Sequence, residues 1–154
     1  MKKVILGVLG ILCAICSTPN LSYAQSAHNS TINEFTYEEA QLLMKVAQAE
    51  AGNQGEDGMW LVMSVVINRV NNDAFPDNLT DVVNQKHQFA TVSNGGIDKV
   101  EISADCHRAL ARIEMGEVSP EIVAFETTQS KTLEKYFSNA FVYRDHVFYT
   151  LTNK

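Results

Sequence analysis

One glutamate stands out because it ends a predicted helix while lying in line with that helix's apolar residues. Leu43, Val46, Ala47 and Glu50 occupy positions i, i+3, i+4 and i+7 of one helical face. Burial on such a face disfavours a charged carboxylate, and so does the negative end of the helix dipole. A carboxyl group that keeps its proton near neutral pH can act as a general acid. The alternative is that the helix frays early and leaves Glu50 solvated.

A second candidate for chemistry is Cys106. With Asp105 it begins a predicted helix, whose dipole favours the thiolate, and His146 lies downstream in a predicted strand. This arrangement is similar to that of NlpC-type cysteine peptidases, although His107-Arg108 stands where those enzymes have a small Ser-Gly pair. Cys106 also begins an apolar stripe that ends at Ile113, which favours a buried structural thiol.

The spacing of possible metal ligands in the sequence does not indicate a metal site. The sequence has no H-E-x-x-H motif, and its histidines are scattered: His28, His87, His107 and His146. We therefore expect neither a metal nor a cofactor.

Several helices must position these residues. Thr36 can cap the first helix, Glu39 completes a capping box, and Gly52 would stop the helix after about Ala51. Glu56 to Val70 is apolar almost all round, which predicts a central helix buried on all sides. Leu79 to Val83 is expected to form one or two helical turns, and Thr91 to Gly96 a loop.

The C-terminal third changes in character. Ser103 caps a further helix, which stops at Gly116. After Pro120, short aromatic and β-branched runs predict strands, with a hairpin turn at Arg144-Asp145. The expected fold class is therefore α+β: a mainly helical domain with a central buried helix and a small C-terminal antiparallel β element.

The first 24 residues have the anatomy of a secretory signal peptide, with two lysines, an apolar run from Val4 to Cys16, and Ala24 at the expected cleavage site. The apolar run is shorter than the ~20 residues that span a bilayer. We expect cleavage after Ala24, export to the cell envelope or the medium, and no stable membrane insertion, rather than a retained anchor. Residues 25–33 are polar and predict a flexible lead, which leaves residues 34–154 as one domain.

Removal of the signal peptide also changes the charge and the thiol content. The net charge goes from −6 to −8 as two lysines are lost, and Cys106 remains as the single cysteine, which allows no disulfide framework. An acidic chain without a basic patch argues against nucleic acid as a partner. We expect a monomer.

The order and spacing of several short motifs resemble the SleB-type cell wall hydrolases, the spore-cortex-lytic enzymes and their vegetative relatives. These motifs are Ala49-Glu50-Ala51, Gly58 in an apolar helix that closes with Asn68-Arg69-Val70, Phe75-Pro76, Gln88-Phe89 and His146-Val147-Phe148-Tyr149. The resemblance covers Ala40 to Tyr149. It implies a lysozyme-like, goose-type-related fold that acts as a catalytic domain on the glycan strands of peptidoglycan, with Glu50 as the catalytic acid.

The chain departs from the family pattern at two places. Gln54 stands where the family usually has a second glutamate, and Arg144-Asp145 stands where it tends to have a glycine before the last-strand histidine. Glycoside hydrolases normally use two carboxylates. Because no second acid occupies a convincing position, we expect a lytic transglycosylase that uses Glu50 alone and forms 1,6-anhydromuramic products.

Six other residues are predicted to bind the substrate, each with a structural alternative. They are Gln88, Phe89, Asn68, Tyr143, His146 and Tyr149. An aromatic ring can stack on a sugar or pack in the core, and an amide can bind an acetamido group or cap a helix. Two other function classes remain open: a cysteine peptidase that cuts stem peptides with Cys106 and His146, and a non-catalytic glycan-binding module.

Overall fold

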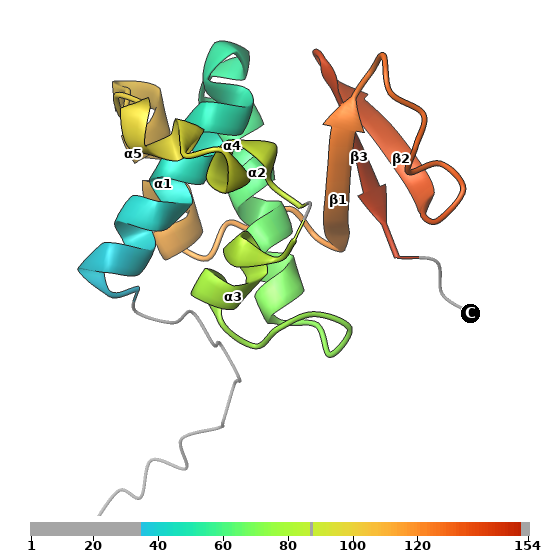
Figure 1. Cartoon of the computed structure of the whole chain (residues 1–154), viewed down its shortest axis with the longest axis horizontal. Coiled ribbons are helices and arrows are strands. Elements are labelled where there is room, and N and C mark those ends of the chain that lie inside the picture. The colour runs from blue at the N-terminus through green and yellow to red at the C-terminus, as the bar shows by residue number, and fades with distance from the viewer. Residues whose placement is uncertain (1–34, 87, 152–154) are drawn as a thin grey trace, which may run out of the picture. The chain divides into compact units, whose positions relative to one another are not determined.

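The structure is a computed structural model that describes residues 35–86 and 88–151. The predicted signal peptide (1–24) and flexible lead (25–33) lie outside these residues, as does His87. Within the described residues, six helical segments precede the final helix and three strands (Figure 1). In chain order they are α1 (Tyr37–Ala51), η1 (Gly52–Gln54), α2 (Gly55–Val70), α3 (Leu79–Asn84), α4 (Ala90–Ser93) and η2 (Gly96–Lys99). They are followed by α5 (Ala104–Glu114), β1 (Ile122–Thr127), β2 (Ser138–Tyr143) and β3 (His146–Thr150).

Helix α1 begins as its sequence predicts. The Thr36 hydroxyl accepts a hydrogen bond from the backbone of Glu39, and the Glu39 side chain accepts one from the backbone of Thr36. The end of the helix differs from the expectation. Gly52 keeps right-handed helical angles and starts η1, and the glycine of this segment that has positive φ is Gly55, at +74°. The chain therefore turns only after Gln54, which places η1 between α1 and α2.

Helix α2 is the centre of the helical layer, as predicted. It packs against α1, α3, α5 and β1. Met59, Val62, Met63, Val65 and Val66 are each fully buried. Complete burial of one such side chain contributes roughly 1.5–3 kcal/mol relative to an exposed one. This packing fixes the direction of α2, and with it the position of the residues at both of its ends.

The strands form one antiparallel sheet in the order β1-β3-β2. The expected hairpin joins β2 and β3 through Arg144 and Asp145, since Tyr143 pairs with His146. Thr127, at the end of β1, pairs with the same His146. The end of β1, the start of β3 and the hairpin turn therefore lie together at one edge of the sheet.

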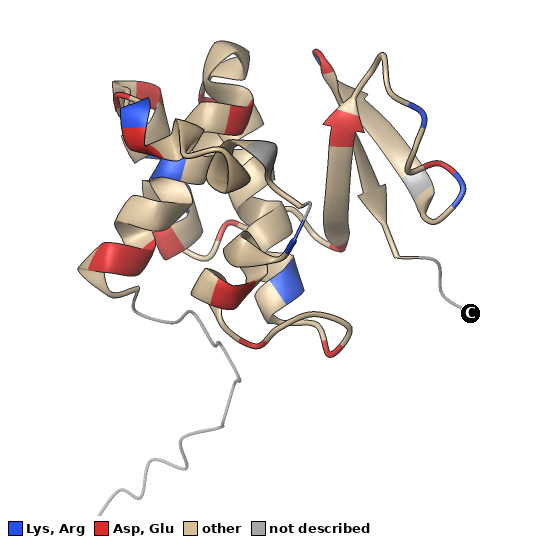
Figure 2. Ribbon diagram, viewed as in Figure 1, with Lys and Arg blue, Asp and Glu red and all other residues tan. Residues whose placement is uncertain are grey.

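Charged side chains are distributed over many elements. In the view of Figure 2, Lys and Arg are interspersed with Asp and Glu and do not gather on one element. Ion pairs link α5 to the start of α2, where Arg112 also lies over the ring of Trp60 at 4.1 Å. None of the described helices is long and apolar enough to cross a membrane.

Candidate active site

Glu50 lies on the wall of a pocket of about 300 Å³, here called the Glu50 pocket. The end of α1 and η1 form one side of it, and the end of β1 with the β2–β3 turn forms the other. Its lining consists of Glu50, Asn53, Gln54, Thr127, Thr128, Gln129, Asp145 and His146. The two carboxyl groups are thus surrounded by amides, hydroxyls and one imidazole.

The position of Glu50 follows from the helical face that the sequence predicts. Leu43, Val46 and Ala47 on this face are fully buried, and Glu50, one turn further on, is half-buried at the pocket wall. The hydroxyl of Thr91, on α4, donates a hydrogen bond of 2.5 Å to Oε1 of Glu50. Glu50 is therefore neither a core residue nor a solvated helix end.

Gln54 and Asp145 are joined by two hydrogen bonds across 91 residues of sequence. Nε2 of Gln54 donates to Oδ2 of Asp145 at 3.1 Å, and the backbone N–H of Asp145 donates to Oε1 of Gln54 at 3.2 Å. Gln54 is only 1% exposed. It fits because residue 58 is glycine, where a Cβ atom would lie 2.2 Å from the Cβ of Gln54.

His146 is the third ionisable residue of the pocket. It is buried, and its ring meets those of Phe125 and Phe148 edge to face. Burial lowers the pKa of His146, while the carboxylates of Glu50 and Asp145 act to raise it. Within the described part of the chain, its Nδ1 atom is buried without a hydrogen-bond partner. The imidazole is therefore neutral near pH 7.

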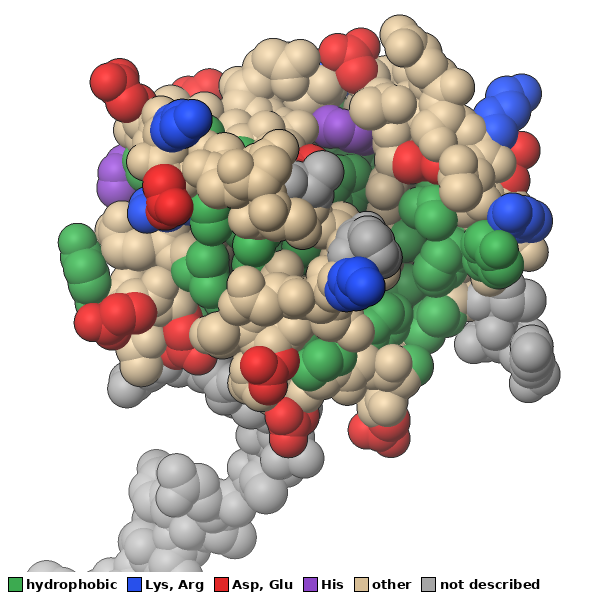
Figure 3. All heavy atoms as spheres, viewed as in Figure 1, with side chains coloured by type: hydrophobic (Ala, Val, Ile, Leu, Met, Phe, Trp, Pro, Cys, Tyr) green, Lys and Arg blue, Asp and Glu red, His purple; other side chains and the backbone are tan. Residues whose placement is uncertain are grey.

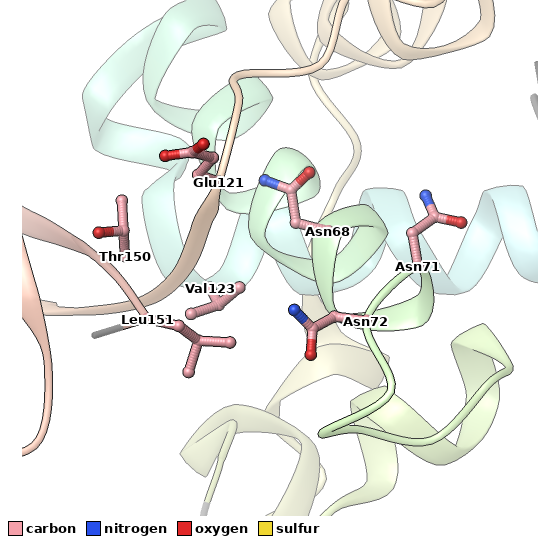
Figure 4. A pocket seen from close by; sticks show the side chains of 7 residues that line it. All are labelled: Asn68, Asn71, Asn72, Glu121, Val123, Thr150 and Leu151. Carbon is pink, nitrogen blue, oxygen red and sulfur yellow. The ribbon is translucent and has the colours of Figure 1, made fainter. Parts of the chain in front are cut away.

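Asn68 lines a different pocket, shown in Figure 4 and here called the Asn68 pocket, of about 280 Å³. The other residues that line it are Asn71, Asn72, Glu121, Val123, Thr150 and Leu151. Nδ2 of Asn68 donates to the carbonyl oxygens of Ser119 and Ile122, each at 2.8 Å. Asn68 therefore ties the last turn of α2 to the start of β1, and the Glu50 pocket lies at the opposite end of that strand.

Gln88 lines a third pocket, of about 260 Å³, together with Arg69 and residues of β1 and the β1–β2 loop. Arg69 is 5% exposed, burial lowers its pKa to about 10, and its guanidinium lies over the rings of Phe75 and Phe89. Phe89 itself is 2% exposed and belongs to the core. On the face drawn in Figure 3, hydrophobic side chains gather where the helices meet the strands.

The two predicted tyrosines also lie outside the lining of the Glu50 pocket. The Tyr143 hydroxyl donates to Asp57 at 3.4 Å, and Arg144 lies over its ring. Tyr149 is 2% exposed and donates to Glu126 at 2.8 Å. Burial, with Glu126 as a further cause, raises the pKa of Tyr149 to about 12. Of the seven predicted site residues, only Glu50 and His146 line the same pocket, the Glu50 pocket.

Cys106 is fully buried, and its Sγ donates to the carbonyl oxygen of Met44 at 3.4 Å. Burial raises the pKa of Cys106 to about 12, so that the thiol form dominates at neutral pH. These observations favour the structural role over the nucleophilic one. Among the described residues, no group of three or more His, Cys, Asp and Glu side chains could hold a metal ion.

Sequence reasoning missed several residues of the Glu50 pocket. Thr91 reads as part of a loop, but it lies in α4 and contacts Glu50. The sequence predicts Asp145 only as a residue of the hairpin turn, but its position next to His146 could have indicated that it lies near the site. Asn53 and Thr127 to Gln129 carry no sequence pattern that distinguishes them from ordinary turn residues.

The family described as Cell Wall Hydrolase matches residues 53–149, and the chain belongs to this family. It is therefore an enzyme of the cell wall hydrolase class, as the sequence predicted. The match begins just after Glu50, so the role of this residue stays a prediction. No curated protein matches the chain in sequence.

Two solved structures have a similar fold. One is the catalytic domain of the Bacillus cereus SleB protein, with a TM-score of 0.66, 18% identity, and coverage of 77% of this chain and 94% of that one. The other is the catalytic domain of the germination-specific lytic transglycosylase SleB from Bacillus anthracis, with a TM-score of 0.65, 18% identity, and coverage of 77% and 98%. These matches confirm the predicted SleB-type, α+β lysozyme-like fold.

Proposed function

We propose that this enzyme cleaves the glycan strands of peptidoglycan between N-acetylmuramic acid and N-acetylglucosamine as a lytic transglycosylase, with Glu50 as its acid and base. The observation that carries the proposal is the half-buried carboxyl group of Glu50 in a pocket of amides and hydroxyls. The similar fold of a germination-specific lytic transglycosylase supports the same reaction.

The chemistry of the lining suits a sugar better than a peptide carboxylate. Asn53, Gln129 and the two threonines offer donors and acceptors for sugar hydroxyl and acetamido groups. In the described part of the chain, the lining contains two carboxyl groups and neither Lys nor Arg. An anionic ligand would meet like charges in this pocket, whereas the positive charge of a glycosidic transition state would be stabilised.

In the proposed mechanism, the Glu50 proton moves to the glycosidic oxygen as the bond from this oxygen to C1 of muramic acid breaks. N-acetylglucosamine leaves as an alcohol, and C1 acquires positive charge. The Glu50 carboxylate then removes the proton of the muramic 6-hydroxyl, and O6 forms a bond to C1. The products are a 1,6-anhydromuramic end and a regenerated acid, and no water is consumed.

The proposed substrate lies outside the cytoplasm, which agrees with the predicted export signal in residues 1–24. We propose that cleavage after Ala24 releases a secreted or envelope enzyme whose catalytic domain spans residues 34–154. Gln88, Asn68 and Tyr143 stay proposed substrate-binding residues, at positions outside the Glu50 pocket. Phe89 and Tyr149, which were also predicted to bind the substrate, are almost completely buried, and for them we propose a packing role.

The test is the mass spectrum of fragments that the purified mature protein releases from sacculi. The proposal predicts anhydromuropeptides, together with their loss in Glu50→Gln at an unchanged melting temperature, because an amide cannot donate the proton. Reducing ends would instead indicate a hydrolase, and cut stem peptides a peptidase. Absence of any released fragment would indicate a binding module.

A further inference from the structure

The side chain of Gln54 holds the Asp145 carboxylate in a defined place on the wall of the Glu50 pocket. Both polar ends of the Gln54 amide are used, one by the carboxylate and one by the backbone N–H of Asp145. Because Gln54 is almost completely buried and packs on Gly58, it has little freedom to move. A carboxylate on the β2–β3 turn is thereby held in the lining of the same pocket as the proposed acid.

This pair also determines how much charge the pocket carries. The amide of Gln54 donates to the carboxylate, so positions 54 and 145 together hold one negative charge. A glutamate at position 54 would bring a second carboxylate to about hydrogen-bond distance of the first, which is unfavourable unless one of them takes up a proton. The hydrogen-bond pattern therefore favours a charge at one of the two positions at a time.

Among the described residues that line the pocket, none carries a positive charge that would cancel this one. His146, the neighbour of Asp145 in sequence and in the pocket, is neutral near pH 7 because burial lowers its pKa. Arg144 lies over the ring of Tyr143 and is not part of the lining. A carboxylate at position 145 thus remains available to a bound sugar.

We propose that Asp145 is the second functional carboxylate of the site, where it stabilises the positive charge that develops on the sugar, and that Gln54 is its positioning residue. The inference rests on glycosidic cleavage as the proposed function, but it assigns no bond and no proton transfer to Asp145. Glu50 remains the group that moves the proton. The expected contribution is purely electrostatic, so it should appear in kcat more than in KM.

The first variant is Asp145→Asn, which keeps the shape and an oxygen that can accept from Gln54 but removes the charge. Loss of one preorganised electrostatic group typically costs about 10²–10³-fold in kcat, and for an exposed carboxylate we expect at least about tenfold. KM should change by less than about twofold. The matched control is Asp77→Asn, which changes an exposed loop aspartate outside the described pockets. It should leave kcat and KM unchanged.

The second variant is the double exchange Gln54→Glu with Asp145→Asn. In this double variant the amide introduced at position 145 would donate to the carboxylate introduced at position 54, the reverse of the wild-type side-chain hydrogen bond. The negative charge moves from position 145 to position 54. Most of the activity lost in Asp145→Asn should return. A double variant as slow as Asp145→Asn, or an Asp145→Asn protein as fast as the wild type, would overturn the inference.

A binding measurement separates this inference from the proposed function. Calorimetry compares two probes: an N-acetylglucosamine tetramer, which is neutral, and an iminosugar that is protonated at neutral pH. Asp145→Asn should weaken binding of the cationic probe at least about tenfold and leave the neutral one almost unchanged. Equal effects on both probes would contradict a role for the Asp145 charge, even in a protein that releases no fragments from sacculi.

Discussion

The hydroxyl of Thr91 donates a hydrogen bond of 2.5 Å to Oε1 of Glu50, which joins the short helix α4 to the last turn of α1. With Oε1 engaged as an acceptor, Oε2 is the oxygen that would carry the transferable proton. The contact also limits the rotation of a side chain that stands at a helix end. Thr91 therefore orients the proposed acid.

Thr91→Val should lower kcat severalfold with little change in KM, because the valine keeps the shape of threonine and loses only the hydroxyl. Thr91→Ser retains the donor and should stay close to the wild type. Steady-state rates on soluble glycan fragments provide the measurement. Equal rates for Thr91→Val and the wild type would mean that other contacts orient Glu50.

The acids that open α2 are expected to serve stability. Arg108 pairs with Glu56 at 2.7 Å, and Arg112 pairs with Asp57 at 2.8 Å, so that α5 is tied to the start of α2. Asp57→Asn should cost about 0.3–1 kcal/mol of unfolding free energy, the usual value of a first-turn acid, and leave the anhydro product unchanged. Denaturant unfolding and product analysis check both points. A folded Asp57→Asn or Glu56→Gln protein that is a hundredfold slower would show that a first-turn acid takes part in catalysis.

Cys106→Ala should keep activity within a fewfold of the wild type and cost about 1 kcal/mol of stability, since it leaves a small cavity in the core. The buried thiol of the wild type should also react slowly with thiol reagents until the protein unfolds. Thermal melts and reagent kinetics provide the measurements. Complete inactivation of a still-folded Cys106→Ala protein would favour the cysteine peptidase instead.

His146 predicts a pH dependence of stability. Burial places its folded-state pKa below the ordinary value of 6.5, so the unfolded chain binds more protons in the interval between the two values. This contribution to stability is present above about pH 6.5 and is lost as the pH falls through the folded-state pKa. Urea unfolding of His146→Gln, measured from about pH 7 to pH 5, should show a shallower decline than the wild type. Parallel declines would be inconsistent with a buried neutral imidazole.

Much of the fold could be predicted because its signals are local. The Thr36–Glu39 capping box, the apolar surface of α2 and the Arg144-Asp145 turn each depend on residues close in sequence. The end of α1 could not be located as well. Gly52 and Gly55 are equally able to adopt positive φ, and packing around the buried Gln54 selects Gly55.

The site was harder to predict because its residues come from distant parts of the chain. Glu50 could be found from its helical face, whereas Asp145 joins it only through a contact between residues 91 positions apart. The two departures from the family pattern, at Gln54 and at Arg144-Asp145, prove to be in direct contact. For Phe89 and Tyr149, the residue type is equally compatible with a place in the core and a place in a binding cleft. Tertiary packing decides that both are buried.

The central claim is that Glu50 supplies both the acid and the base, so that the muramic 6-hydroxyl and not water attacks C1. It is tested most directly by a digest of sacculi with the mature enzyme in water enriched in oxygen-18, followed by mass spectrometry of the muramic ends. The account predicts anhydromuramic ends without the heavy isotope, and no such ends from Glu50→Gln. Reducing muramic ends that each carry one oxygen-18 atom would contradict it.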